Sequence, residues 1–192
     1  PQNSGIVVRF NAPIDRATVD QTTFTLLADG AQTPVAGDWE WGGNRELLFR
    51  PIAPLPQGQY ELTLGGGILD IKADTVGQPI TTTFSISFTV AAEQDVAPPQ
   101  IVQLLPDGSL TTPISPVVAR FSEAINPGSI SEFTLWVKSA QGYDVDGRVG
   151  VSSDGREAAF VPWQPFAAGE SYTLYVSGDV RDLAGNALGA PG

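Results

Sequence analysis

Three oxygen-bearing residues near the end of the sequence, Asp179, Asp182 and Asn186, have the side chains of a calcium site. Calcium takes several carboxylate and carbonyl oxygens, and closely spaced residues can supply them. The segment 182–186 (Asp-Leu-Ala-Gly-Asn) also suits a structural turn, in which Asp182 accepts backbone N–H bonds and Gly185 or Asn186 adopts left-handed backbone. We expect the turn and keep calcium as the alternative.

One aromatic residue stands in a sequence typical of a loop. Trp163 lies between two prolines in Pro-Trp-Gln-Pro, residues 162–165, which favours an exposed ring. Exposed aromatic rings can bind the faces of sugars, so Trp163 is a candidate ligand residue. Trp39 and Trp41 fall on one side of an expected strand, and we expect them to pack in a core.

The residues that support most enzyme chemistry are absent from the chain. It contains no His and no Cys, which excludes disulfides, thiol nucleophiles, His-dependent triads and the usual zinc and copper ligands. A pair of carboxylates could still act as in a glycosidase, but no sequence feature marks a raised pKa. Neither Lys72 nor Lys138 has a Ser-x-x-Lys context. We therefore expect no enzyme, and no cofactor beyond the calcium alternative.

Charge and hydropathy exclude two further classes. The net charge is −11, with 10 Lys and Arg against 21 Asp and Glu, whereas nucleic-acid binding needs clustered cations. No apolar run approaches the roughly 20 residues of a membrane-spanning helix. We expect neither a nucleic-acid partner nor a transmembrane segment.

An internal repeat divides the sequence into two copies. Residues 6–10 (Ile-Val-Val-Arg-Phe) recur as residues 117–121 (Val-Val-Ala-Arg-Phe), an offset of 121 − 10 = 111. The same offset relates Arg45, Phe49, Pro51, Pro54 and Gly58 to Arg156, Phe160, Pro162, Pro165 and Gly169. We also pair residues 24–26 with 133–135 (Phe-Thr-Leu in both), which requires a two-residue deletion in the second copy.

Each copy has the pattern of an all-β domain. Short alternating segments are separated by Gly, Pro and Asp clusters, with single helical turns expected only near residues 15–20 and 126–131. We predict one domain over residues 1–92, a proline-rich linker over 93–99 and a second domain over 100–192. The first copy lacks an opening strand comparable to residues 101–105, and the second lacks a closing strand comparable to 81–90. An open sheet edge is a template for another strand, so strand exchange is one interpretation and excision from a longer array the other.

These motifs resemble the bacterial Ig-like domain of S-layer and other surface proteins. The resemblance implies two tandem immunoglobulin-like antiparallel β-sandwich domains. It covers nearly the whole chain, although residues 70–74 of the first copy replace the family's Asp-x-x-Gly-Asn turn. The matching motifs of the second copy are Leu105-Pro106-Asp107-Gly108, Phe121-Ser122, Ile125-Asn126-Pro127, Phe133-Thr134-Leu135, Asp154-Gly155-Arg156, residues 162–172 and residues 182–186.

The resemblance implies an extracellular or cell-surface protein of a bacterium. We expect a structural or adhesive segment that acts as a spacer or as a self-assembling unit of an S-layer or filament. Its partners would be neighbouring domains or copies of itself, with a polysaccharide or another surface protein as further candidates. The alternatives are an accessory carbohydrate- or protein-binding module of a secreted enzyme, and β-domains of a macroglobulin-like protein, which would need a thioester-bearing region that this sequence lacks.

Overall fold

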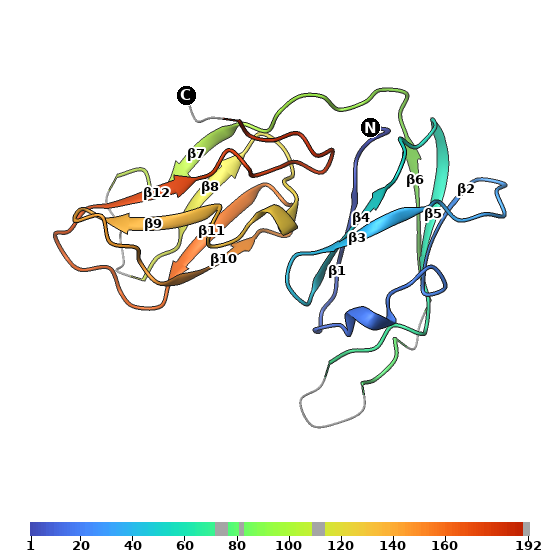
Figure 1. Cartoon of the computed structure of the whole chain (residues 1–192), viewed down its shortest axis with the longest axis horizontal. Coiled ribbons are helices and arrows are strands. Elements are labelled where there is room, and N and C mark those ends of the chain that lie inside the picture. Colours follow the sequence, from blue (N-terminus) through green and yellow to red (C-terminus); the bar gives the residue numbers. More distant parts are fainter. Residues whose placement is uncertain (72–76, 81–82, 109–113, 190–192) are drawn as a thin grey trace. The chain divides into compact units, whose positions relative to one another are not determined.

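The computed structural model describes residues 1–71, 77–80, 83–108 and 114–189 (Figure 1). It divides into two compact units, Pro1–Asp95 and Val96–Gly192, each of which is described by itself. Strands and two single-turn 3-10 helices make up the regular structure of the described residues. The expected all-β fold with antiparallel pairing is confirmed.

The first unit consists of two antiparallel three-stranded sheets. One sheet has the order β1-β4-β3, with bounds Ile6–Arg9, Glu46–Pro51 and Gly37–Trp41. The other has the order β2-β5-β6, with bounds Phe24–Ala28, Gly58–Leu64 and Phe84–Val90. Core residues alternate along the strands, as Phe24 and Leu26 do in β2 and Leu47 and Phe49 in β4, and Leu62 of β5 joins the same core.

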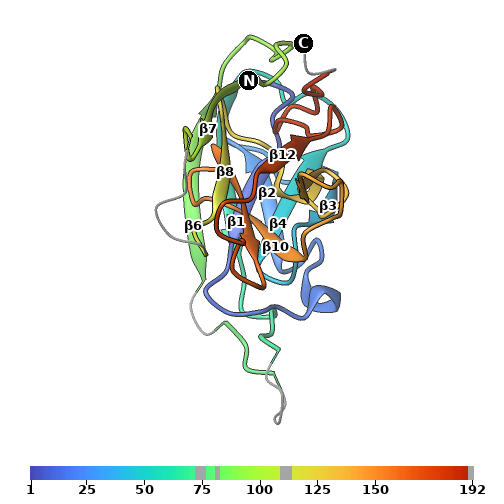
Figure 2. The ribbon, with the colours of Figure 1, turned by 90° about the vertical axis from the view of Figure 1, so that its left-hand side faces the viewer.

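The second unit repeats this plan with a different distribution of strands. One sheet has the order β10-β11-β8-β7, with bounds Gly147–Val151, Glu157–Pro162, Val117–Phe121 and Ile101–Leu105. The other pairs β12, Tyr172–Val176, with β9, Leu135–Ser139. Both views of the ribbon show β7 beside β8 (Figures 1 and 2). The core contains Phe121, Ile125, Leu135, Val137 and Phe160.

Matching helical turns confirm the internal repeat. In the first unit, η1 (Arg16–Thr18) is capped by Asp15, whose carboxylate accepts a hydrogen bond from the backbone N–H of Ala17. In the second, η2 (Pro127–Ser129) is capped in the same way by Asn126. A short polar side chain before a turn satisfies an N–H group that has no partner within the turn, which explains why Asp and Asn stand at these positions.

The predicted pairing of residues 24–26 with 133–135 is wrong. Phe24 begins β2 and is 2% exposed, whereas Phe133 precedes β9 and is 80% exposed. The buried counterpart of Phe24 is Leu135, the first residue of β9, at an offset of 135 − 24 = 111. When the strands are aligned by burial, the two copies keep the offset of 111 here and no deletion is needed. The two Phe-Thr-Leu segments are therefore not structurally equivalent.

Neither 3-10 helix, nor any other helix among the described residues, has the length and apolar character needed to cross a membrane.

Candidate ligand groove and metal ligands

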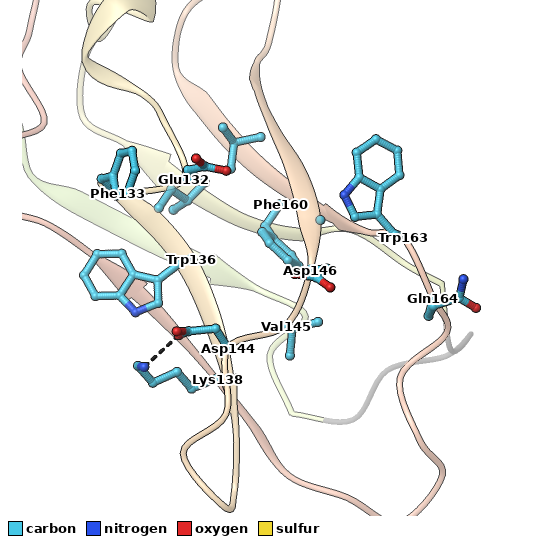
Figure 3. A pocket seen from close by; sticks show the side chains of 13 residues that line it. Glu132, Phe133, Trp136, Lys138, Asp144, Val145, Asp146, Phe160, Trp163 and Gln164 are labelled. Carbon is cyan, nitrogen blue, oxygen red and sulfur yellow. Dashed lines mark hydrogen bonds and ion pairs between the residues drawn. The ribbon is translucent and has the colours of Figure 1, made fainter.

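A groove of about 830 Å³ opens between the edge strands β9 and β10 of the second unit. The two strands belong to opposite sheets, so the groove follows an open side of the sandwich. Its floor includes Leu135 and Phe160, which also belong to the core. The walls carry aromatic, acidic and amide side chains, which gives the groove both apolar and polar contacts (Figure 3).

Trp163 lies on one wall of this groove, where it directly follows β11. Its side chain is among the exposed large hydrophobic groups, at 61%. The backbone N–H of Trp163 donates to the carbonyl of Asp146 at 3.0 Å, which holds the loop against the segment before β10. The expected exposure of Trp163 is thus observed, and its binding of a ligand stays a prediction.

Trp136 and Phe133 lie on the other wall, and neither was predicted from the sequence as a ligand residue. Figure 3 shows them across from Trp163, with Phe160 and Asp146 between. The Trp136 ring stacks on Tyr175 of β12, with centroids 5.4 Å apart and an interplanar angle of 7°. The alternation of buried Leu135 and Val137 in β9 places residue 136 on the outer face, a signal that was present in the sequence.

An ion pair lies in the groove on the same side as Trp136. Lys138 Nζ donates to Asp144 Oδ1 at 2.7 Å, and the two residues lie beside Trp136 in the groove (Figure 3). Both groups are accessible to solvent, so the pair contributes little to stability. It places one cationic and one anionic group where a polar ligand would reach them.

In the first unit, tryptophans occupy the corresponding side of the sandwich. Trp39 of β3 stands where Val149 stands in β10, because both pair with the core phenylalanine of the neighbouring strand. The Trp39 ring contacts Phe24 and Phe49, with centroids 6.4 and 6.0 Å away. Its buried Nε1 has no hydrogen-bond partner among the described residues. Trp39 therefore packs as a core residue, as expected.

The segment 182–186 has the geometry of a structural turn. The Asp182 side chain is fully buried, and its Oδ1 accepts the backbone N–H of Asn186 at 2.8 Å. Its Oδ2 accepts the Asn186 amide at 2.8 Å. Gly185 has a φ of 96°, a left-handed value that residues with a Cβ rarely adopt. The turn therefore uses the carboxylate to hold its own backbone.

The three calcium candidates are only partly brought together. Asp182 and Asn186 are in contact, but Asp179 is exposed and accepts the hydroxyl of Ser177 at 3.0 Å. Within the second unit, Glu123 has a carboxylate oxygen within 4.8 Å of one on Asp182, although Glu123 was not predicted from the sequence as a ligand. Calcium takes about six to eight oxygens, and both carboxylate oxygens of Asp182 already accept hydrogen bonds from Asn186. Calcium binding here stays a prediction.

The first unit keeps the same carboxylate despite its different sequence. Asp70 forms a backbone bridge with Ile14, as Asp182 does with Ile125. Asp70 Oδ1 accepts the backbone N–H of Gln78 at 2.6 Å, the bond that Asp182 makes with Asn186. Of the substituted motif at 70–74, residues 72–74 lie outside the described residues. A carboxylate at this position thus organises a connection in both units.

Two aspartates outside these sites have shifted pKa values. The Thr22 hydroxyl and neighbouring backbone N–H groups lower the pKa of Asp20. The Ser152 hydroxyl and the Arg156 N–H lower the pKa of Asp154. Both carboxylates hold turns in exposed loops, and hydrogen bonds to the charged form explain the direction. A general acid needs the opposite shift, so neither aspartate is suited to that role.

No curated protein matches the sequence of this chain. The solved structures that resemble it include surface layer protein SbsC, domains 1-6, with 16% identity, 90% of this chain and 24% of that chain covered, and a TM-score of 0.40. Titin domains z1z2 in complex with telethonin show 13% identity, 90% and 87% coverage and a TM-score of 0.22. The family described as bacterial Ig-like domain matches residues 1–90 and again 95–192. The chain therefore belongs to the bacterial Ig-like domain family and consists of two copies in tandem.

Proposed function

We propose that the chain is a non-catalytic structural segment of a bacterial surface or secreted protein and acts as a spacer. Each unit has a hydrophobic core of its own, so each resists unfolding without help from a ligand. Membership of the bacterial Ig-like domain family supports the location and the structural role. The work of such a segment is to hold the parts on either side of it at a set distance.

The linker is the observation that carries the spacer proposal. In the first unit, Asn3 binds both backbone groups of Asp95: Nδ2 donates to the carbonyl at 2.6 Å, and Oδ1 accepts the N–H at 2.8 Å. In the second unit, the Asn186 amide donates to the carbonyl of Ala97 at 3.2 Å, and Pro99 is buried. Each end of the linker is thus tied to its own unit. Little chain is left free to bend, and Pro98-Pro99 favours extended backbone.

The test is a distance distribution measured across the linker. Because the chain lacks native Cys, one spin label can be placed in each unit at Thr33→Cys and Ser153→Cys. We expect a narrow distribution by pulsed electron resonance, and a broader one when Asn3→Ala and Asn186→Ala release the linker. Asn11→Ala is the matched control, because this asparagine is exposed and remote from the linker in sequence. A broad distribution in the unmodified chain would contradict the spacer role.

The groove of the second unit supports an accessory carbohydrate-binding module as a second candidate. Trp163 offers an exposed ring on one wall, and Trp136 and Phe133 offer rings on the other. Sugars stack on such rings and hydrogen-bond to nearby carboxylates and amides. Retention on insoluble polysaccharide should fall with Trp163→Ala while Tm stays unchanged. Trp163→Phe should restore part of the retention, because it keeps an aromatic face. Equal retention of all three proteins would exclude this function.

A further inference from the structure

The polar and aromatic side chains of the groove between β9 and β10 are not requirements of the fold. Equivalent hydrogen bonds show which residues of the two units correspond. Trp163 donates its N–H to the carbonyl of Asp146 at 3.0 Å, and Ile52 donates its N–H to the carbonyl of Ala36 at 3.1 Å. The second unit thus has an acidic and an aromatic residue where the first has Ala36 and Ile52.

The wall formed by β9 differs between the units in the same way. β2 and β9 pair in matching register with β5 and β12, and the turns before them share a bond from a backbone N–H to a threonine hydroxyl. Three uncharged polar residues of the first unit are replaced on this wall: Gln21 by Glu132, Thr22 by Phe133 and Thr25 by Trp136. The first unit forms the same pair of strands without rings or acids here, so folding does not explain their presence.

Two carboxylates give the groove a net negative charge. Lys138 is paired with Asp144 at 2.7 Å, so these two charges balance each other. Glu132 and Asp146 are exposed, and neither side chain has a hydrogen bond or an ion pair within the part of the chain that the structure describes. A groove lined by one sign of charge attracts ligands of the opposite sign, so this groove favours cations.

Aromatic rings lie around these two carboxylates. Figure 3 shows Asp146 between Trp163 and Trp136, and Glu132 beside Phe133. The face of an aromatic ring is electrostatically negative, so it attracts an ammonium group as well as an apolar surface. Rings and carboxylates together therefore suit a ligand that has flat apolar faces and carries positive charge.

The backbone of the β9 wall is already bonded within the chain. Leu135 donates its N–H to the carbonyl of Ser131 at 2.9 Å, and the carbonyl of Val137 accepts the N–H of Val145 at 2.9 Å. Strand addition by a peptide needs a continuous row of free N–H and C=O groups, which this wall does not offer. Its side chains remain for binding, and they match the faces and polar substituents of sugar rings.

We propose that the groove binds a polysaccharide whose sugar rings carry free amino groups. The sugar faces would pack on the rings of Trp163, Trp136 and Phe133. The ammonium groups would donate charge-assisted hydrogen bonds to Glu132 and Asp146. The groove volume of about 830 Å³ falls within the range of about 300–1,000 Å³ found for small-ligand sites, so it accommodates a short stretch of the polymer. This inference rests on the carbohydrate-binding candidate function and names its ligand class.

The experiment compares two tetrasaccharides of identical linkage that differ in charge. One is built of glucosamine, with an amine on every ring, and the other of N-acetylglucosamine, with none. Each is titrated into the full chain by calorimetry at about pH 5.5, where amines are protonated and carboxylates are ionised. We expect the Kd of the amine form to be about tenfold lower, because charge-assisted hydrogen bonds add to stacking. The ratio of the two Kd values should fall towards one in high salt.

A double variant removes the charge of the groove and keeps its shape. Glu132→Gln with Asp146→Asn should weaken binding of the amine form by about tenfold and leave the N-acetylated form unchanged. Asp38→Asn with Glu170→Gln is the matched control, because it removes two exposed carboxylates outside the groove and gives the same net charge. Both double variants should keep the Tm of the unmodified chain. Equal weakening by both would mean that general attraction to an acidic protein binds the amine, which would overturn the proposal.

The neutral tetrasaccharide separates failure of this inference from failure of the carbohydrate-binding function. If the N-acetylated form binds as tightly as the amine form, the function stands and the preference for amino groups is wrong. If neither form binds, both are wrong. Trp163→Ala should weaken both forms, because stacking does not depend on the amine.

A lysine tetrapeptide tests whether the groove recognises charge alone. It should bind the full chain more weakly than the glucosamine tetrasaccharide, because its side chains have no flat apolar face to pack between the rings. If it binds as tightly, and the groove double variant weakens it while the matched control does not, the occupant is a basic polypeptide and the proposal is wrong.

Discussion

The same side of the sandwich is packed in the first unit and open in the second. Trp39 and Trp41 of β3 stand where Val149 and Val151 stand in β10, on strands with the same pairing. In the first unit Trp39 contacts two core rings, and in the second the smaller valine borders the groove. A single backbone plan thus gives either a filled side or an accessible one, and the difference lies in side-chain size.

Both units nevertheless keep one close contact at this side. Gly37 and Gly147 begin the edge strands, and a Cβ at either position would collide with the ring of Phe49 or Phe160. The ring lies directly over the glycine backbone in both copies. Both units therefore share a fixed centre, in which a phenylalanine ring covers a glycine. They differ beside it, where the first unit has Trp and the second has Val.

The largest effect is expected from removing the fixed centre. Phe49→Ala and Phe160→Ala should each destabilise their own unit by about 3–5 kcal/mol, because both rings are buried. We expect the greater loss for Phe49, because its ring packs against two others: its centroid lies 4.8 Å from that of Phe24, and it also contacts Trp39. Calorimetry should show one transition lowered in each variant. A shift of both transitions would mean that the two cores do not unfold independently.

Trp39→Val converts the packed side into the open one. The lost contacts with Phe24 and Phe49 should cost about 2–4 kcal/mol, reduced because the buried indole N–H has no partner among the described residues. Val149→Ala, the matched change at the open side, should cost no more than about 1–2 kcal/mol. Chemical denaturation monitored by circular dichroism measures both. Equal losses would show that the groove side is packed as well as the first unit's side.

Asp182→Ala should destabilise the second unit by about 1–3 kcal/mol, because the buried turn loses two acceptors while their donors remain. Asp70→Ala should cost less, since Asp70 is only half-buried. If the turn is structural, EDTA will not change the Tm of the unmodified chain or of the Asp182→Ala variant. A Tm of the unmodified chain that rises with added calcium, and does not rise in Asp182→Ala, would establish the calcium alternative instead.

The elements were predictable from the sequence because periodicity and turn residues are local. The two copies, their β-class and the helical turns near residues 15–20 and 126–131 follow from such local patterns. The alignment of Phe24 with Phe133 was wrong, because it followed identical residue types, whereas burial depends on the opposing sheet. Trp136 and Glu123 were missed, because their surroundings come from residues distant in sequence. Asp182 was predicted correctly as a turn residue, since its partner lies four positions away.

The smallest effect is expected at the exposed carboxylates that hold a turn in each unit, Asp20 in the first and Asp154 in the second. Hydrogen bonds from the hydroxyls of Thr22 and Ser152 respectively lower the pKa values of these two carboxyls below their ordinary range. Their stabilising contribution is therefore complete above about pH 4 and is lost as pH falls through the lower folded pKa. Asp20→Ala and Asp154→Ala should each lower one calorimetric transition slightly at neutral pH, and the difference from the unmodified chain should vanish in strong acid. Asn11→Ala, at an exposed residue whose side chain does not titrate, is the control and should show no such pH dependence. A difference that persists unchanged in acid would mean that the aspartates act through packing and not through their charge.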